Sequence, residues 1–171
     1  MITVNVHSPR AFADAGLSFS NESAIPLLCR ELGKHGLENP VVVTVGKEGD
    51  KVAGEACKTL GAEHILARTS RNRQTGTVEV GLDPADLRGR DVAVVDDIIS
   101  TGGTMIETVR QLRAAHVSKI YIGAVHLLLV GNADEKLFQA GADLLLGTDT
   151  VPSKYSHVSV SEVLSRALTS R

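Results

Sequence analysis

Short apolar runs rich in β-branched residues recur along the chain, and amphipathic stretches separate them. The predicted strands are Ile2–Val6, Val41–Val45, Ile65–Ala67, Thr77–Val80, Val92–Val95, Ile120–Val125 and Leu144–Leu146. The predicted helices are Ser23–His35, Asp50–Leu60, Gly103–Ala115, Asn132–Ala140 and Ser161–Leu168. This alternation is typical of a parallel sheet that helices cover on both faces. We therefore expect an α/β fold of three layers with a mostly parallel central sheet.

The length of the chain favours a single domain. It has 171 residues, and no repeat, low-complexity tract or proline-rich linker divides it. We therefore expect one domain over residues 1–171. Aromatic residues make up only 3% of the chain and tryptophan is absent, so valine, leucine, isoleucine and alanine must fill the core.

The charge balance limits the kinds of partner. Lysine and arginine total 18 against 20 aspartate and glutamate residues, which gives a formal net charge of −2. Such a chain has no overall positive field for nucleic acid or for an anionic membrane surface. No apolar run approaches the ~18 residues of a membrane-spanning helix, and no basic stretch precedes an apolar one at the N-terminus. We expect a soluble cytoplasmic protein without a nucleic-acid or membrane partner.

The segment from Val92 to Thr104 carries the clearest functional signal. An apolar strand leads into Asp96 and Asp97, and a loop of small residues then opens a helix. In open α/β sheets ligands lie beyond the carboxyl ends of strands, which would place both carboxylates beside a substrate. The free backbone N–H groups at a helix N-terminus attract phosphate. The residues expected to hold that phosphate are Ser100, Thr101, Gly102, Gly103 and Thr104.

The residue types of this loop suit a sugar phosphate. Its glycines let the backbone approach a ligand closely, and its threonines can donate hydroxyl hydrogen bonds to phosphate oxygens. A carboxylate would repel the phosphate unless it faced another part of the ligand. Asp96 and Asp97 are therefore assigned to ribose hydroxyls or to a bound cation. The alternative is an ordinary strand-to-helix turn with solvated acids.

This segment resembles the binding motif for phosphoribosyl diphosphate (PRPP) in the type I phosphoribosyltransferase fold. The rest of the chain resembles the C-terminal half of the ribose-phosphate diphosphokinase, or PRPP synthetase, family, especially its archaeal-type sequences. The similar stretches are, in order, residues 2–7, 41–44, 88–112, 124–126, 134–141 and 147–150. The resemblance implies the phosphoribosyltransferase-like fold. It does not extend to the N-terminal half of that family, which supplies much of the ATP site.

The resemblance also implies roles for individual residues. Asp96 and Asp97 would bind the ribose 2- and 3-hydroxyls, and the loop from Ser100 to Thr104 would bind the 5-phosphate. His7 would lie near the ATP phosphates, and His7 and Asp96 would be ligands of Mg²⁺. The implied pyrophosphate loop contains Gly46 and Lys47, and the implied catalytic residues are Arg68, Arg71 and Arg73.

Three departures from the family pattern fall on the ATP, metal and pyrophosphate side. Asn5 replaces an acidic residue, and Gly46 stands where the family has an aspartate. Arginines stand where the family has a catalytic lysine and arginine, and a planar guanidinium is not equivalent to a compact ammonium. The residues that would bind the ribose and its 5-phosphate match the family pattern. We therefore expect binding of ribose 5-phosphate or PRPP, with synthesis of PRPP by this chain alone in doubt.

Three functions stay open at this point. The first is an Mg²⁺-dependent enzyme of the PRPP synthetase type that uses ATP. The second is a phosphoribosyltransferase that joins PRPP to a nucleobase and releases pyrophosphate. The third is a non-catalytic regulatory subunit that binds a PRPP synthetase. A homo-oligomer is the usual expectation for a soluble enzyme.

Two segments outside the motif carry weaker signals. The polar, basic stretch from Arg68 to Gly76 is predicted to be an exposed loop. His126 follows an apolar strand, and either a subunit contact or the phosphate site would explain its position. Cys29 and Cys57 lie far apart and outside any metal-binding spacing, so buried free thiols are expected.

Overall fold

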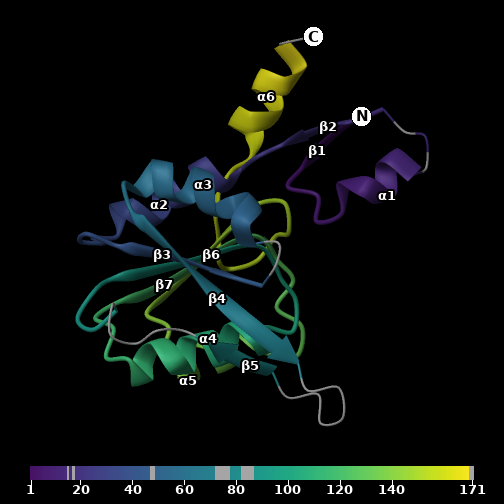
Figure 1. The fold of residues 1–171 in the computed structure, drawn as a ribbon. Helices are drawn as coiled ribbons and strands as arrows, with labels where there is room; N and C mark the ends of the chain where they lie inside the picture. The colour runs from purple at the N-terminus through teal and green to yellow at the C-terminus, as the bar shows by residue number, and fades with distance from the viewer. Residues whose placement is uncertain (15, 17, 47–48, 72–77, 82–86, 170–171) are drawn as a thin grey trace.

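The computed structural model describes residues 1–14, 16, 18–46, 49–71, 78–81 and 87–169 (Figure 1). Seven strands form the main sheet in the spatial order β5-β4-β3-β6-β7-β8-β9. These strands are β3 (Val41–Val45), β4 (Glu63–Arg71), β5 (Val78–Gly81), β6 (Val92–Ile99), β7 (Ile120–Leu127), β8 (Leu144–Thr148) and β9 (Ser156–Val158). All neighbours run parallel except β4 and β5, which pair antiparallel.

Helices cover both faces of this sheet, so the prediction of a three-layer α/β fold with a mostly parallel sheet is confirmed. The helices against the sheet are α2 (Ile25–Lys34), α3 (Gly49–Leu60), α4 (Gly103–Ala114) and α5 (Ala133–Ala140). In Figure 1, α2 and α3 lie on one side of the strands, and α4 and α5 lie on the other. Within the described residues, none of the helices is both long enough and apolar enough to span a membrane.

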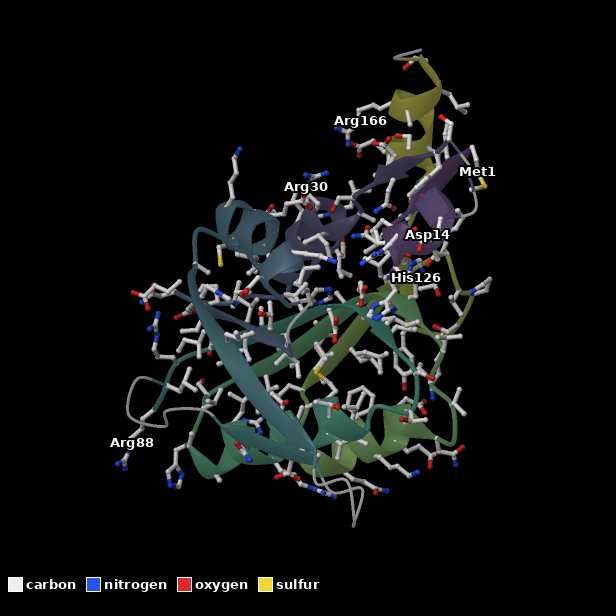
Figure 2. All side chains as sticks on the ribbon, turned by 45° about the vertical axis from the view of Figure 1, so that its right-hand side comes forward. Met1, Asp14, Arg30, Arg88, His126 and Arg166 are labelled. Atoms are coloured by element: carbon white, nitrogen blue, oxygen red, sulfur yellow. The ribbon has the colours of Figure 1, made fainter. Side chains whose placement is uncertain are left out.

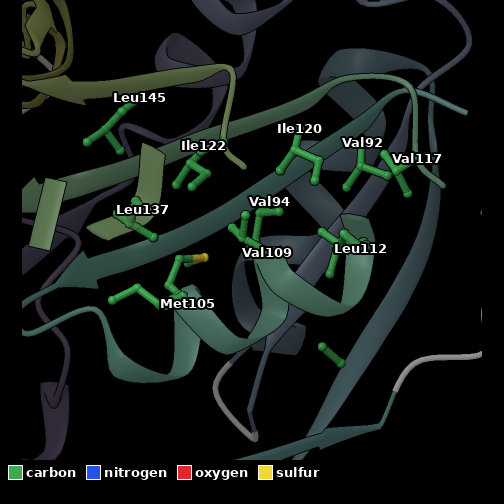
Figure 3. Close-up of a cluster of buried hydrophobic side chains, with 14 of the residues drawn as sticks. Val92, Val94, Met105, Val109, Leu112, Val117, Ile120, Ile122, Leu137 and Leu145 are labelled. Carbon is green, nitrogen blue, oxygen red and sulfur yellow. The ribbon is translucent and has the colours of Figure 1, made fainter. Parts of the chain in front are cut away.

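The two faces of the sheet build two separate cores. Val92 and Val94 of β6 point into the core beneath α4 and α5. Ala93 and Val95 point into the core beneath α2 and α3. This alternation follows from the period of two along a strand, and it explains why all four residues from Val92 to Val95 are apolar. Figure 3 shows the first core, where α4 packs its apolar side chains against the strands.

A smaller part of the chain stands away from this body. It consists of β1 (Ile2–Val4), α1 (Pro9–Asp14), β2 (Ser20–Glu22) and α6 (Ser161–Thr169), which we call the projecting lobe (Figure 1). β1 and β2 form their own two-stranded parallel sheet. The predicted strand Ile2–Val6 therefore ends earlier than expected, and it does not belong to the main sheet.

Several predicted strand boundaries are wrong, and three short elements were not predicted. β6 continues to Ile99, so Asp96 and Asp97 lie within the strand, and Asp96 pairs with Ala124 of β7. β4 continues to Arg71, whose partner in β5 is Val78. The first residues of the predicted loop at 68–76 are thus part of a β-hairpin. The sequence also did not predict α1, β2 or β9, which have six residues or fewer.

The close contact of β7 with α2 leads to a test of the packing. A methyl group on Gly123 would lie 2.8 Å from Leu32 Cδ1 and 3.1 Å from Leu28 Cδ2. Gly123→Ala should therefore lower the free energy of unfolding by about 1–3 kcal/mol in chemical denaturation. Gly54 of α3 has no atom within 4 Å of the same position. Gly54→Ala should raise stability by roughly 0.5–1 kcal/mol, and equal losses in both variants would contradict this packing.

Candidate functional site

The loop between β6 and α4 borders a cavity at the end of the main sheet. The cavity measures about 190 Å³. Its lining includes Asp96 together with Ser100, Thr101, Gly102, Gly103 and Thr104. Asp96 and the predicted phosphate loop therefore face the same cavity. We call the residues from Ser100 to Thr104 the phosphate loop from here on.

The backbone of this loop leaves the start of α4 available to a ligand. Gly102 precedes the helix with φ 70°, a conformation that favours glycine, and no side chain caps the helix there. A methyl group on Gly102 would come within 3.3 Å of Ala133 Cβ at the start of α5. The first backbone N–H groups of a helix have no acceptor within it. The N-terminus of α4 can thus donate to an anion in the cavity.

The connection between β7 and α5 forms backbone hydrogen bonds to the start of the phosphate loop. The backbone N–H groups of Leu128 and Leu129 donate to the carbonyl oxygen of Ile99, at 2.9 and 3.3 Å. The N–H of Val130 donates to the carbonyl of Ser100 at 3.0 Å. Leu129 has φ 50°, which fits this tight backbone path. The sequence does not indicate this support, because apolar side chains do not reveal backbone hydrogen bonds.

Asp96 and Asp97 have unequal environments. The backbone N–H of Asp97 donates to Asp96 Oδ1 at 2.8 Å. Burial is the main cause that raises the pKa of Asp96 to about 7, and the neighbouring charge of Asp97 contributes to this rise. The hydrogen bond from the Asp97 backbone and the nearby His7 act in the opposite direction. In the absence of a ligand or a cation, the protonated form of Asp96 is therefore favoured far more than in an exposed aspartate.

His7 lies beside this acidic pair. Its Nδ1 is 2.7 Å from Asp97 Oδ2, although 90 positions separate the two residues in sequence. The Asp97 side chain is 16% exposed and the His7 side chain 58% exposed, so the histidine lies on the solvent side. The structure therefore brings His7, Asp96 and Asp97 together, and their shared role in binding stays a prediction.

His126 holds the chain segment that carries His7. Its Nε2 donates to the carbonyl oxygens of Val4 and Asn5, at 3.1 and 3.3 Å. Its Nδ1 lies 2.8 Å from the hydroxyl of Thr150. Figure 2 shows His126 on the side of the body that faces the projecting lobe. The subunit or phosphate contact predicted for His126 is untested, whereas its link to β1 was not predicted.

Asn5 has a structural partner of its own. The residue has φ 41°, and its Oδ1 accepts a hydrogen bond of 2.6 Å from the backbone N–H of Ala24, just before α2. Asparagine adopts this left-handed conformation more readily than most residues. Its amide oxygen thus accepts a backbone N–H at the start of α2, and it does so at the position where the resembled family has an acidic residue.

Two further cavities share His7 and Lys51. One, of about 220 Å³, is lined by residues that include Asn5, His7, Lys51 and Asp97. The other, of about 440 Å³, is lined by His7, Ser8, Pro9, Arg10 and Lys51. No pattern in the sequence indicates a role for Lys51 or Arg10. A larger cavity of about 590 Å³ lies between α2 and α6. Asp96, Asp97 and the phosphate loop are not among its lining residues.

The predicted pyrophosphate and catalytic residues are described only in part. Gly46 directly follows β3 with φ 73°, and its N–H donates to the carbonyl of Ala67 at 3.3 Å. Lys47 lies outside the described residues. The backbones of Arg68 and Arg71 belong to β4, but their side chains lie outside the described part. Arg73 lies outside it entirely, so these catalytic assignments stay predictions.

The acidic pair offers suitable donors for magnesium. Mg²⁺ takes oxygen ligands, keeps several waters, and is usually held by one or two carboxylates together with substrate phosphates. Among the described residues, no three His, Cys, Asp or Glu side chains gather closely enough to hold a metal ion. The donors therefore fit an ion shared with a phosphorylated ligand and do not fit an ion held by protein alone. His7 and Asp96 remain predicted ligands, and imidazole nitrogen is the less suitable donor of the two.

Comparison with protein families gives one match over most of the chain. The model of the phosphoribosyl transferase domain matches residues 24–156. The matched region includes β6, the phosphate loop and α4. Residues of β1 and α6 lie outside it.

Two curated proteins with similar sequences have related names. The ribose-phosphate pyrophosphokinase of Sulfurisphaera tokodaii is 34% identical over 164 residues, which cover 95% of this chain and 56% of that protein. Ribose-phosphate pyrophosphokinase 2 of Archaeoglobus fulgidus is 37% identical over 168 residues, which cover 96% of this chain and 59% of that protein. This chain thus spans little more than half the length of these relatives.

Solved structures show the same relation in three dimensions. The phosphoribosylpyrophosphate synthetase of Mycobacterium smegmatis matches with a TM-score of 0.79 and 25% identity, over 99% of this chain and 57% of that one. The adenine phosphoribosyltransferase of Giardia lamblia, complexed with 9-deazaadenine, matches with a TM-score of 0.59 and 20% identity. The second likeness shows the fold alone.

Proposed function

The chain belongs to the phosphoribosyl transferase domain family, as its sequence had indicated, and from this premise we propose that it binds ribose 5-phosphate or PRPP at the end of β6. One observation carries the proposal. Asp96 and the phosphate loop line a single cavity, so a donor site for phosphate and an acceptor site for hydroxyls face one ligand. Ribose 5-phosphate has both groups, with its phosphate at one end and its vicinal hydroxyls at the other.

The proposed binding mode divides the ligand between the two parts of the site. The 5-phosphate accepts hydrogen bonds from the first N–H groups of α4 and from the hydroxyls of the phosphate loop. The ribose 2- and 3-hydroxyls donate to the carboxylates of Asp96 and Asp97. His7 is placed by its contact with Asp97 to orient that carboxylate. Because the two carboxylates face the hydroxyls, they do not oppose the phosphate directly.

Magnesium has a place in this proposal next to the acidic pair. Asp96 would hold the ion together with phosphate oxygens of the ligand, and His7 is the second predicted ligand. The bound ion would neutralise negative charge on those phosphates. Its charge would also favour ionised Asp96, whose pKa is raised in the structure.

The proposed reaction is transfer of a diphosphoryl group from ATP to ribose 5-phosphate. The 1-hydroxyl oxygen attacks the β-phosphorus of ATP, the bond to the α-phosphate oxygen breaks, the hydroxyl proton leaves to solvent, and AMP departs. Such transfer depends mainly on positioning and on stabilisation of charge. The cavity beside His7 and Lys51 offers cationic groups for the polyphosphate, and Arg68, Arg71 and Arg73 are the proposed groups at the transferring phosphate.

A second candidate function is a regulatory subunit that binds the sugar phosphate without turnover. Asn5 favours it, because its side chain accepts the hydrogen bond from Ala24 and supplies no negative charge for a metal. On this proposal the partner is a PRPP synthetase subunit.

A phosphorus NMR time course distinguishes these functions. The protein is mixed with ribose 5-phosphate, ATP and Mg²⁺, and the diphosphate resonances of PRPP and the signal of AMP are followed. Synthetase activity predicts both products. No product, together with PRPP binding in calorimetry, would favour the regulatory subunit. Release of pyrophosphate from PRPP only when a nucleobase is added would instead identify a base phosphoribosyltransferase. No binding of either sugar phosphate would refute the proposed site.

The proposed role of the three arginines gives a separate prediction. In the triple variant Arg68→Ala, Arg71→Ala, Arg73→Ala, the affinity for PRPP should fall at least tenfold, because guanidinium groups pair strongly with phosphates. The affinity for ribose 5-phosphate, which lacks the pyrophosphate group, should change little. Calorimetry with both ligands measures the difference. Equal losses for the two ligands would contradict a role at the pyrophosphate.

A further inference from the structure

The ring of His126 joins two parts of the chain that are more than 120 positions apart in sequence. Its Nε2 faces the carbonyl oxygens of Val4 and Asn5, and its Nδ1 lies 2.8 Å from the Thr150 hydroxyl. Carbonyl oxygens only accept hydrogen bonds, so the ring must carry a proton at Nε2. Figure 2 shows this residue on the side of the body that faces the projecting lobe. His126 therefore donates from the main sheet to the lobe.

The main sheet holds the ring from its other side. His126 is part of β7 and pairs with Ile98 of β6. The Thr150 hydroxyl lies 2.9 Å from the Val125 carbonyl oxygen and 2.9 Å from the Thr148 hydroxyl. Thr148 is fully buried, and its hydroxyl donates to the same carbonyl at 2.8 Å. Because the ends of two strands fix its surroundings, the ring presents Nε2 at a defined position.

The segment that accepts this hydrogen bond leads to the acidic pair. His7 follows Asn5 by two positions, and its Nδ1 lies 2.7 Å from Asp97 Oδ2. The N–H of Asn5 bonds to the Glu22 carbonyl of β2, which belongs to the same lobe. The bonds from His126 instead tie the segment to the main sheet, where Asp97 lies. They therefore help to fix His7 relative to Asp97.

We propose that His126 is a positioning residue for the ribose end of the site. Its Nε2–H holds the carbonyls of Val4 and Asn5, and this keeps His7 against Asp97. The contact with His7 then orients the Asp97 carboxylate for the ribose hydroxyls. This role rests on the proposed function, in which that carboxylate accepts from the sugar.

The phosphate loop is held in another way. Backbone N–H groups of residues 128–130 bond to the carbonyls of Ile99 and Ser100, and a change of the His126 side chain removes none of these bonds. Inorganic phosphate needs only this loop, whereas ribose 5-phosphate also needs the carboxylates. The two ligands therefore report separately on the phosphate end and on the ribose end of the site.

Two amide variants isolate the Nε2 donor. The side-chain amide of glutamine can reach the position of Nε2, whereas asparagine is one methylene shorter and reaches only that of Nδ1. In NMR titrations of the phosphate loop amides, His126→Asn should lower the affinity for ribose 5-phosphate at least ~tenfold, because a hydrogen bond to a charged group is lost. Its affinity for inorganic phosphate should stay unchanged. His126→Gln should bind both ligands almost like the unaltered chain.

A measurement without ligand tests the contact itself. Nuclear Overhauser signals should connect the His7 ring with the β-protons of Asp97 in the unaltered chain and in His126→Gln. In His126→Asn these signals should disappear, while those within the phosphate loop remain. If His126→Asn does not fold, Thr150→Val takes its place, because it removes the hydroxyl at Nδ1 and keeps the shape of the side chain. It should weaken binding of ribose 5-phosphate and spare that of inorganic phosphate.

Three results would overturn the proposal. Equal losses for ribose 5-phosphate and inorganic phosphate would show a general structural effect. Equal losses in His126→Gln and His126→Asn would show that the Nε2 donor is not the cause, and unchanged binding in His126→Asn would show that the ring has no role. If the unaltered chain binds no sugar phosphate, the proposed function fails. Loss of the signals between His7 and Asp97 in His126→Asn would then still support the role of His126 in placing His7, and their retention would overturn it.

Discussion

Replacing Gly103 with valine should lower the affinity for ribose 5-phosphate at least ~100-fold while the melting temperature stays almost unchanged. Gly103 is the first residue of α4, and a methyl group at this position has no protein atom within 4 Å. Gly103 also lines the cavity with the phosphate loop. The larger side chain would take the space of the phosphate and displace at least two hydrogen bonds to a charged group, at about 1.5–3 kcal/mol each. Calorimetry and thermal unfolding measure the two effects.

The neighbouring glycine provides the matched control. Gly102 has φ 70°, and a methyl group there would press on Ala133 Cβ at 3.3 Å. Gly102→Ala should therefore lower the melting temperature, because alanine is strained at positive φ and the start of α5 must shift. Loss of binding in Gly102→Ala would thus accompany loss of stability. If Gly103→Val bound ribose 5-phosphate like the unaltered chain, the phosphate would not lie at this loop.

The fold was predictable wherever burial and periodicity agree. β3 has the predicted bounds, because all its residues are apolar or buried between two helical layers. α4 also begins and ends within one residue of its prediction. In contrast, β2 consists of Ser20, Asn21 and Glu22, which have no strand pattern, and it exists because β1 pairs with it. Pairing with β7 likewise extends β6 through two acidic residues, against their low strand propensity.

The site was predictable where it is local in sequence. Asp96 and the phosphate loop are close neighbours on one strand-loop-helix unit, so the pattern of residues alone indicated their shared cavity. Resemblance to a family placed His7 near the metal, but its contact with Asp97, 90 positions away in sequence, was not predicted. No pattern around His126 indicates that its ring bonds to the carbonyls of Val4 and Asn5. Such contacts depend on where the projecting lobe meets the sheet, which periodicity does not encode.

The raised pKa of Asp96 predicts that Asp96→Asn stabilises the free protein at alkaline pH. Burial, together with the neighbouring charge of Asp97, raises this pKa to about 7 in the folded chain, whereas an unfolded aspartate titrates near 3.9. Between these values the folded state binds more protons than the unfolded state, so stability falls as the pH rises. Asparagine has no charge to bury, and its amide oxygen can still accept the hydrogen bond from the Asp97 N–H. In metal-free buffer, urea unfolding should show a gain on the order of a few kcal/mol at pH 8 and a much smaller gain at pH 5.

Asp134 provides a control of opposite sign for the same experiment. Its carboxylate accepts hydrogen bonds from Lys154 and Tyr155, and the bond from Lys154 is the main cause that lowers its pKa. A lowered pKa contributes stability above the unfolded value, and that stability is lost as the pH falls through the folded value. Asp134→Asn should therefore destabilise the protein to a similar degree at pH 8 and at pH 5, with the loss shrinking only below about pH 4. If Asp96→Asn showed this same pattern, the carboxylate of Asp96 would be stabilised by its surroundings as an anion, and the penalty assigned to its burial would be wrong.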